Sequence, residues 1–165
     1  MGKQVKSKTI LGSLTALLVA AATPLAAAAP TTDKLSQMFI WWNQAFKQPG
    51  AYTPENFGRY FTADATLTLN GETVIHGLDD WSKHFQAIQA SGALVEIVVP
   101  FKDAFEKDGR LYTYHIIRSR RNGKVGCMLA AGHADLRGDK IAAITLVRVP
   151  VDTTKPSVDP QCWTS

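Results

Sequence analysis

The sequence lacks most of the short motifs that identify an enzyme directly. It contains no glycine-rich phosphate loop and no Gly-x-Ser-x-Gly nucleophile motif. Its four histidines have neither His-x-His nor His-x-x-x-His spacing, and no Cys-x-x-Cys pair accompanies them. The sequence therefore gives little support to a metal site, and we expect neither a metal nor a cofactor. It also lacks internal repeats and an interdomain linker, so we expect one domain.

The chain has little net charge once its N-terminus is set apart. The formal charge is +4, but three of the lysines lie in the first eight residues, and without them the charge falls to +1. Arg118, Arg120 and Arg121 form a short basic cluster beside Asn122-Gly123, which is typical of an exposed hairpin end. A nucleic-acid partner needs a concentrated basic face, so we expect none.

The apolar segment at residues 10–22 is too short to span a membrane. Its 13 residues fall below the roughly 20 that a helix needs to cross a bilayer. A basic stretch precedes it and Ala26-Ala27-Ala28 follows, which is the pattern of a secretory signal peptide. We therefore divide the chain into a signal peptide (1–28), a domain (29–151) and a C-terminal tail (152–165). The exported protein is expected to be periplasmic or secreted, with no membrane span after cleavage.

Only two cysteines are present. Cys127 lies in a strand pattern and Cys162 lies in the proline-rich tail. In an exported protein a disulfide between them would attach the tail to the sheet and contribute about 4 kcal/mol to stability. The alternative is a buried free Cys127 with a disordered tail, and the sequence leaves both arrangements open.

Helical periodicity dominates the first part of the domain. Apolar residues recur on one helical face over residues 35–48, and Thr53-Pro54-Glu55 has the pattern that begins a short second helix. A third helix is expected from Asp79 to Ser91-Gly92. His84 on this helix is expected to face solvent. Trp41 lies off the apolar face of the first helix, where it would mark a contact with a second subunit.

The remaining segments have the period of two that is typical of strands. Two short strands around the Asn70-Gly71 turn separate the second and third helices. Tight-turn sequences then divide the rest of the domain into strands at residues 94–99, 103–107, 110–121, 124–137 and 140–151. Strands joined by tight turns are antiparallel, and helices on one face would bury both sets of apolar residues. The sequence thus predicts an α+β fold.

Three segments together resemble the nuclear transport factor 2-like superfamily, in particular its ketosteroid isomerase and SnoaL-like branch. They are the run from Tyr60 to Thr66, Ile75-His76-Gly77 at a helix start, and Gly138-Asp139-Lys140-Ile141 at a strand entry. The resemblance covers residues 35–149. It implies a cone-shaped fold with three N-terminal helices on a strongly curved, mixed but mainly antiparallel sheet. It also implies a homodimer through the open sheet, but this scaffold serves many functions.

The catalytic groups of ketosteroid isomerases are not matched. The resemblance places the general base at Leu69 or Asn70, and neither side chain can take a proton from carbon. The first helix contains no tyrosine for the oxyanion site, and the late-strand aspartate position falls on Ala131 or Gly132. Steroid isomerisation by that mechanism is therefore not expected.

His133 and Asp135 are the candidate catalytic pair. They lie two apart on a predicted strand, so both face one side with their backbones about 6.5 to 7 Å apart. Asp135 could orient the imidazole of His133, and His115 on the neighbouring strand could join them if the register allows. The alternative is that this pair lies on the solvated or dimer-facing side of the sheet, while Met128, Ala130, Ala134 and Leu136 face the core.

Aromatic residues from all three helical segments favour a ligand pocket. Such side chains, laid against a concave sheet, would enclose an apolar cavity. We expect most of them to fill the core, and we assign to the pocket lining Trp42, Tyr60, Phe61, Trp81, Leu69 and Ala131.

Three hypotheses for function follow. The first is an exported domain that binds a small hydrophobic molecule. The second is a cofactor-free SnoaL-like enzyme, of the isomerase, cyclase, dehydratase or hydrolase type, that uses His133 and Asp135. The third is a protein-interaction domain that uses the open sheet face.

Overall fold

The computed structural model describes residues 1–2 and 33–164, so the expected signal peptide lies almost entirely outside the described residues. Within residues 33–164, three helices and seven strands follow one another. The helices are α1 (Lys34–Ala45), α2 (Pro54–Phe57) and α3 (Leu78–Ala90). The strands are β1 (Phe61–Leu69), β2 (Glu72–His76), β3 (Leu94–Ile97), β4 (Asp103–Lys107), β5 (Arg110–Arg121), β6 (Lys124–Arg137) and β7 (Lys140–Pro150).

The first two helices begin at side-chain caps. The Asp33 carboxylate accepts a hydrogen bond from the backbone N–H of Ser36 at 2.8 Å, and the Thr53 hydroxyl caps α2 in the same way. Helix α1 ends at Ala45, three residues before the predicted end at Gln48, because Gln48 precedes a proline and is disfavoured in helical conformation. No helix in the described part of the chain is long and apolar enough to cross a membrane.

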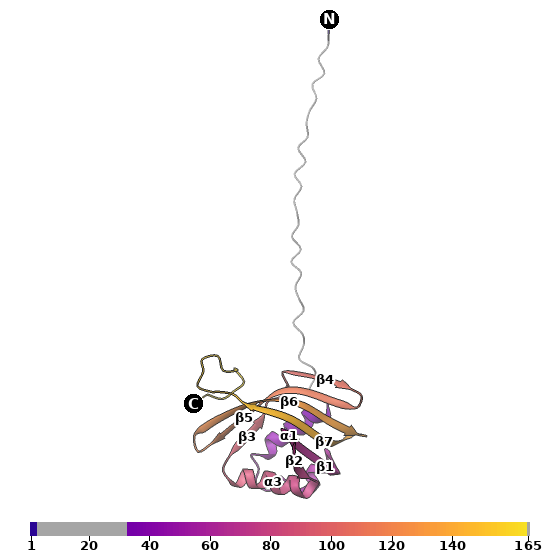
Figure 1. Cartoon of the computed structure of the whole chain (residues 1–165), viewed down its shortest axis with the longest axis vertical. Coiled ribbons are helices and arrows are strands. Elements are labelled where there is room, and N and C mark those ends of the chain that lie inside the picture. The colour runs from indigo at the N-terminus through magenta and orange to yellow at the C-terminus, as the bar shows by residue number, and fades with distance from the viewer. Residues whose placement is uncertain (3–32, 165) are drawn as a thin grey trace.

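The seven strands form one curved sheet in the order β2-β1-β7-β6-β5-β3, and β4 also pairs with β5 (Figure 1). Strand β1 runs parallel to β7, and the other pairs are antiparallel, so the sheet is mixed. The turns before β5 and β6 place Asp108 and Asn122 at positive φ, as the Asp-Gly and Asn-Gly sequences predict. Strand β3 ends at Ile97, two residues earlier than predicted.

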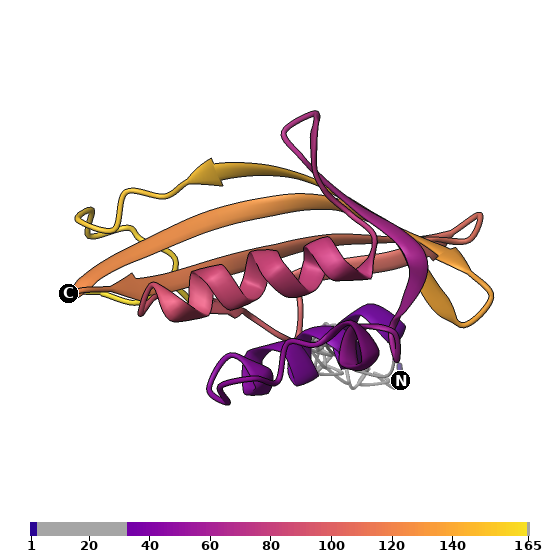
Figure 2. The same cartoon turned by 90° about the horizontal axis from the view of Figure 1, so that it is seen from below.

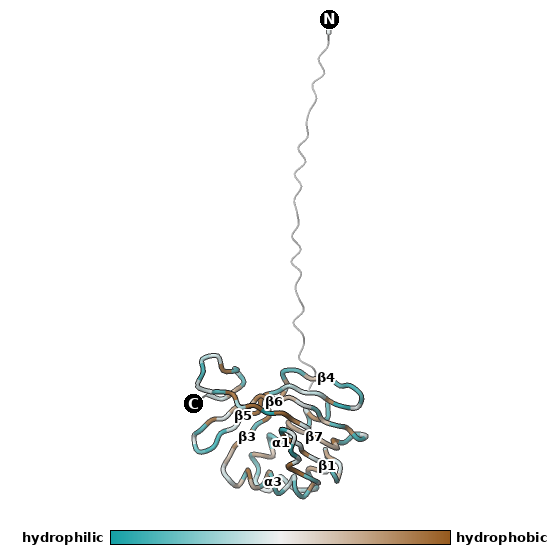
Figure 3. Tube along the Cα trace, viewed as in Figure 1, coloured by the Kyte–Doolittle hydropathy of each residue, from teal (hydrophilic) through white to brown (hydrophobic). Residues whose placement is uncertain are grey.

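The helices cover the concave face of the sheet. Figure 2 shows α3 lying along the strands with α1 beside it, and in Figure 3 the most hydrophobic stretches lie along the strands. Fully buried aromatic rings fill the space between the helices and the sheet, among them Tyr52, Phe57 and Phe61. The ring centroid of Phe61 lies 4.5 Å from that of Trp81. The core is therefore mainly aromatic between the helices and aliphatic on the sheet.

Side-chain amides attach the helices to their surroundings. Asn43 of α1 donates to the carbonyl of Ile97 at 2.8 Å and accepts from its N–H at 2.9 Å, so it continues the hydrogen bonding of strand β3. Gln89 of α3 donates to the carbonyl of Phe46 at 2.8 Å. These bonds fix both helices relative to the sheet edge and to each other.

The C-terminal tail crosses the outer, convex face of the sheet. A disulfide joins Cys127 of β6 to Cys162, with their Cα atoms 5.6 Å apart. The bridge packs against Ile116 in a small cluster separate from the main core. Beyond it, the guanidinium of Arg118 lies 4.9 Å from the ring centroid of Trp163. The tail is therefore attached to the sheet rather than free.

Candidate functional site

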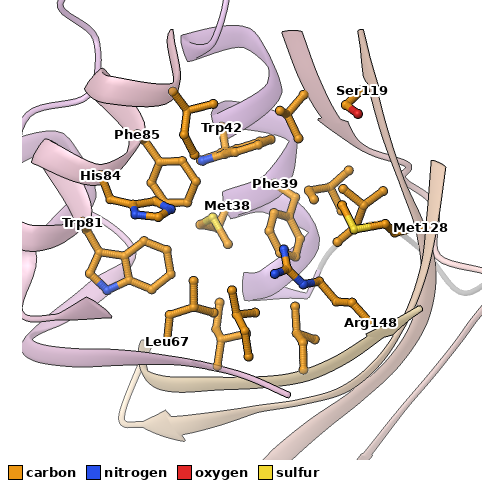
Figure 4. A pocket seen from close by; sticks show the side chains of 17 residues that line it. Met38, Phe39, Trp42, Leu67, Trp81, His84, Phe85, Ser119, Met128 and Arg148 are labelled. Carbon is orange, nitrogen blue, oxygen red and sulfur yellow. The ribbon is translucent and has the colours of Figure 1, made fainter. Parts of the chain in front are cut away.

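A cavity of about 210 Å³ lies between helices α1 and α3 and the concave face of the sheet (Figure 4). It exceeds the apolar cavities of about 150 Å³ that accommodate benzene. The helices line it with Met38, Phe39, Trp42, Trp81, Phe85 and Ile88. The strands line it with Leu67, Leu69, Val95, Ile97, Ile117, Met128, Ile144 and Leu146. The remaining lining residues are polar: His84, Ser119 and Arg148.

His84 lies on the cavity side of α3, so the expectation that it faces solvent is wrong. It follows Trp81 by three residues and precedes Ile88 by four, and these spacings place all three side chains on one helical face. Burial, and secondarily the positive charge of Arg148, lower the pKa of His84 below its ordinary value of 6.5. The imidazole is therefore neutral at neutral pH.

Arg148 on β7 is the cation of the cavity. Its side chain is half-buried, and in Figure 4 the guanidinium points inward beside Phe39. The Nε atom is buried without a hydrogen-bond partner among the described residues. Sequence reasoning missed this residue, although Ile144, Leu146 and Arg148 alternate along the strand and so share its inner face.

Three of the six residues assigned to the pocket from sequence line this cavity: Trp42, Trp81 and Leu69. Tyr60 and Phe61 do not line it. Phe61 is 1% exposed and lies against Trp81 in the packed core. Tyr60 stacks on Trp41, with their ring centroids 5.2 Å apart. The sequence-based assignment differs here because the α2 region packs among aromatic side chains instead of reaching the open volume.

Ala131 also differs from the sequence-based expectation. It is exposed on the outer face of the sheet, because its neighbour Ala130 takes the inward position on β6. The ring of Trp41 packs edge-on against Phe57 and Tyr52 within the same chain, and the side chain is half-buried. Its contact with a second subunit stays a prediction.

The candidate catalytic pair lies outside the cavity. His133 Nε2 is 3.8 Å from Asp135 Oδ2, but Asp135 has a closer partner in Arg110, whose Nε is 2.6 Å from Asp135 Oδ1. His133 borders a surface hollow on the outer face with Tyr112 and Ala131. The pair thus occupies the solvated side of the sheet, which was the alternative that the strand pattern left open.

His115 does not join this pair. The register places it opposite Ala130, on the inner face of the sheet, whereas His133 lies opposite Tyr112 on the outer face. His115 is fully buried beside the rings of Phe39 and Phe101, and neither ring nitrogen has a hydrogen-bond partner among the described residues. Burial lowers its pKa to about 4. The acid–base cluster of three residues is therefore not formed.

Leu69 and Asn70, where the sequence resemblance places the general base of the isomerases, carry no acid or base. Leu69 lines the cavity, and the side-chain oxygen of Asn70 accepts a hydrogen bond from the backbone N–H of Arg148 at 2.7 Å. None of the described residues that line the cavity is a carboxylate. Within residues 33–164, no cluster of three or more His, Cys, Asp or Glu side chains is arranged to hold a metal ion.

Solved structures with the same architecture identify the fold. An NTF2-like protein of unknown function from Exiguobacterium sp. 255-15 is 20% identical over 72% of this chain and 98% of its own, with a TM-score of 0.56. A protein from Jannaschia sp. CCS1, provisionally described as a SnoaL-like polyketide cyclase, is 10% identical over 70% of this chain and 82% of its own, with a TM-score of 0.52. A third protein, from Acidithiobacillus ferrooxidans, is provisionally described as a polyketide cyclase. It is 11% identical over 71% of this chain and 89% of its own, with a TM-score of 0.52.

These similarities define the fold class. The chain has the nuclear transport factor 2-like α+β fold, with helices on a strongly curved mixed sheet, which confirms the fold that the sequence resemblance implied. No protein-family model matches the sequence. No curated protein matches it either. At these identities the likeness concerns the fold, and the site must carry any argument about function.

Proposed function

We propose that this protein binds a small apolar molecule in the cavity between α1, α3 and the sheet. The observation that carries this proposal is an open volume of about 210 Å³ with an almost continuous apolar and aromatic lining. Protein cores are otherwise packed with few voids larger than a water molecule. Filling this one with apolar ligand surface would gain roughly 25 cal/mol for each Å² removed from water. Two proteins of the same fold are provisionally described as polyketide cyclases, which supports a small organic molecule as the occupant.

The neutral probe 2-naphthalenemethanol tests this proposal in a calorimetric titration. We expect the wild-type protein to bind it with a dissociation constant below about 1 mM. Leu69→Phe places a larger side chain in the cavity and should weaken binding at least about tenfold. Val74→Phe, at an exposed position of β2, is the matched control and should bind as the wild type does. Absence of binding, or equal binding by the two variants, would contradict the proposal.

We further propose that the protein is exported. The pattern of residues 1–28 supports this, and so does the disulfide between Cys127 and Cys162, because disulfides persist mainly in oxidising compartments. The mature chain should begin at Ala29 and be recovered from the periplasm or the medium. A full-length chain retained in the cytoplasm would contradict export.

A second candidate function is supported by the outer face of the sheet. Tyr114, Ala131 and Val147 are cross-strand neighbours there, and Val147 is 61% exposed. Phe105 is 56% exposed and stacks on Tyr112 beside them. Contiguous exposed apolar groups of this kind mark interaction surfaces. We propose that two copies of the chain associate through this face, beside the region that the tail covers.

The Val147→Glu variant tests the association. A charge at the centre of a self-complementary interface meets its own copy across the two-fold axis, so the variant should be monomeric. Size-exclusion chromatography with light scattering at tens of micromolar protein should show a dimer for the wild type. Val74→Glu, on exposed β2, should remain dimeric. A monomeric wild type would exclude this interface.

A further inference from the structure

Arg148 is a half-buried cation with no anionic partner among the described residues. Within residues 33–164, no ion pair or side-chain hydrogen bond holds its guanidinium, and its Nε is enclosed without an acceptor. Arg118 shows the contrast. It is similarly half-buried on the outer face, and its Nε is likewise enclosed without an acceptor, but its terminal nitrogens pair with the carboxylate of Glu96 and donate to the carbonyl of Gln161. A partly buried charge is stabilised by a paired anion, so the unpaired guanidinium of Arg148 is a site at which an anion from outside the chain would gain binding energy.

None of the described residues that line the cavity carries a negative charge that could neutralise Arg148. Its neighbours in the cavity are apolar side chains, apart from the Ser119 hydroxyl and the His84 imidazole. In Figure 4 the guanidinium lies across the cavity from Trp81 and His84. The positive charge of Arg148 contributes to the lowered pKa of His84, so the imidazole is neutral and adds no competing charge. The cavity therefore combines one cation with an extended aromatic wall.

The backbone at Arg148 is fixed from the neighbouring turn. The Asn70 side-chain oxygen accepts the Arg148 N–H at 2.7 Å, and the Asn70 N–H donates to the Leu146 carbonyl at 2.8 Å. Asn70 adopts a positive φ of 52° and, directly after β1, continues the pairing of β1 with β7. Two hydrogen bonds to Asn70 thus hold the backbone from which the guanidinium projects. This limits the conformational entropy that ligand binding must remove.

We propose that the occupant of the cavity is a small organic acid, with an apolar body against Trp42, Trp81 and Phe85 and one carboxylate paired with Arg148. The planar guanidinium presents N–H groups in the geometry that a carboxylate accepts with both oxygens. The inference rests on the proposed function, because it requires the same cavity to be a ligand site. It adds the charge and the chemical class of the ligand.

Two probes of nearly the same shape separate the contributions of charge and apolar surface. Calorimetry compares 2-naphthoate with the neutral 2-naphthalenemethanol on the wild-type protein, on Arg148→Met and on Arg121→Met. Wild type should bind the naphthoate about 10- to 100-fold more tightly than the alcohol. Arg148→Met should lose this preference and keep its affinity for the alcohol within about threefold, since methionine retains the apolar stem. Arg121→Met removes a charge at the exposed hairpin end and should retain the wild-type preference.

The proposal of an acidic ligand would be overturned if wild type bound the two probes with equal affinity. It would also be overturned if Arg148→Met lost affinity for both probes by the same factor. In either case the proposed function would still stand if wild type binds the alcohol and Leu69→Phe weakens that binding. If neither probe binds wild type, the cavity is not a ligand site and both proposals fall. If Arg148→Met does not fold, the relative affinities of wild type for the two probes still test the proposal of an acidic ligand.

Discussion

Replacing Cys162 with serine is expected to lower the free energy of unfolding by about 4 kcal/mol. The bridge to Cys127 closes a loop over a sequence separation of 35 residues, and the chain-entropy model assigns about this stabilisation to a loop of such length. For a domain of this size the loss corresponds to a fall in Tm of roughly 10 °C. The bridge also covers Ile116, so its removal exposes the small apolar cluster under the tail.

Thermal denaturation with and without reductant checks this prediction. A thiol reductant should bring the wild type down to the Tm of Cys162→Ser, while the variant itself should not respond. Ser157→Ala, an exposed position in the same tail, controls for changes that do not touch the bridge. A wild-type Tm that is insensitive to complete reduction would show that the bridge contributes nothing to stability.

Acidification from pH 6.5 to pH 4 is expected to remove about 3 kcal/mol of stability through His115 alone. Burial lowers the pKa of His115 from 6.5 to about 4 in the folded protein. Between these two values the unfolded chain binds more protons than the folded one, so stability falls as the pH falls. The contribution is fully present above about pH 6.5 and is lost by about pH 4. The cause is a buried imidazole with no hydrogen-bond partner among the described residues.

His115→Leu should remove this part of the acid sensitivity. Leucine fits the apolar surroundings of Phe39 and Phe101 and leaves no unpaired ring nitrogen, so the variant should be at least as stable as wild type at pH 7. Urea unfolding at pH 7, 6, 5 and 4 measures the difference. His76→Leu, at an exposed position, is the matched control. Parallel stability curves for wild type and His115→Leu would contradict the assignment.

Local turn chemistry made most of the sheet predictable. Asp108-Gly109 and Asn122-Gly123 specify tight turns, and strands β4, β5 and β6 have the predicted bounds because these turns fix where each strand ends. The parallel pairing of β1 with β7 joins segments far apart in the chain, and no local pattern specifies it. For that pairing the resemblance to the nuclear transport factor 2-like superfamily carried information that periodicity could not supply.

The cavity was less predictable than the fold. Trp42, Trp81 and Leu69 were assigned to it because large apolar residues on inward faces have few other places to lie. His84 and Arg148 were missed because polar residues are assigned to solvent by default, and only the packing reveals that their faces turn inward. His133 and Asp135 attracted a catalytic interpretation through their spacing. Spacing reports that two side chains share a face, but not which face.

The indole N–H signals of the four tryptophans test whether a ligand enters the cavity between the helices and the sheet. Trp42 and Trp81 line the cavity, whereas Trp41 packs against Phe57 and Tyr60 and Trp163 lies in the tail on the outer face. In ¹H–¹⁵N correlation spectra, added 2-naphthalenemethanol should shift the signals of Trp42 and Trp81 and leave that of Trp163 in place. A titration that moves only Trp41 or Trp163, or none of the four, would contradict a ligand site between the helices and the sheet.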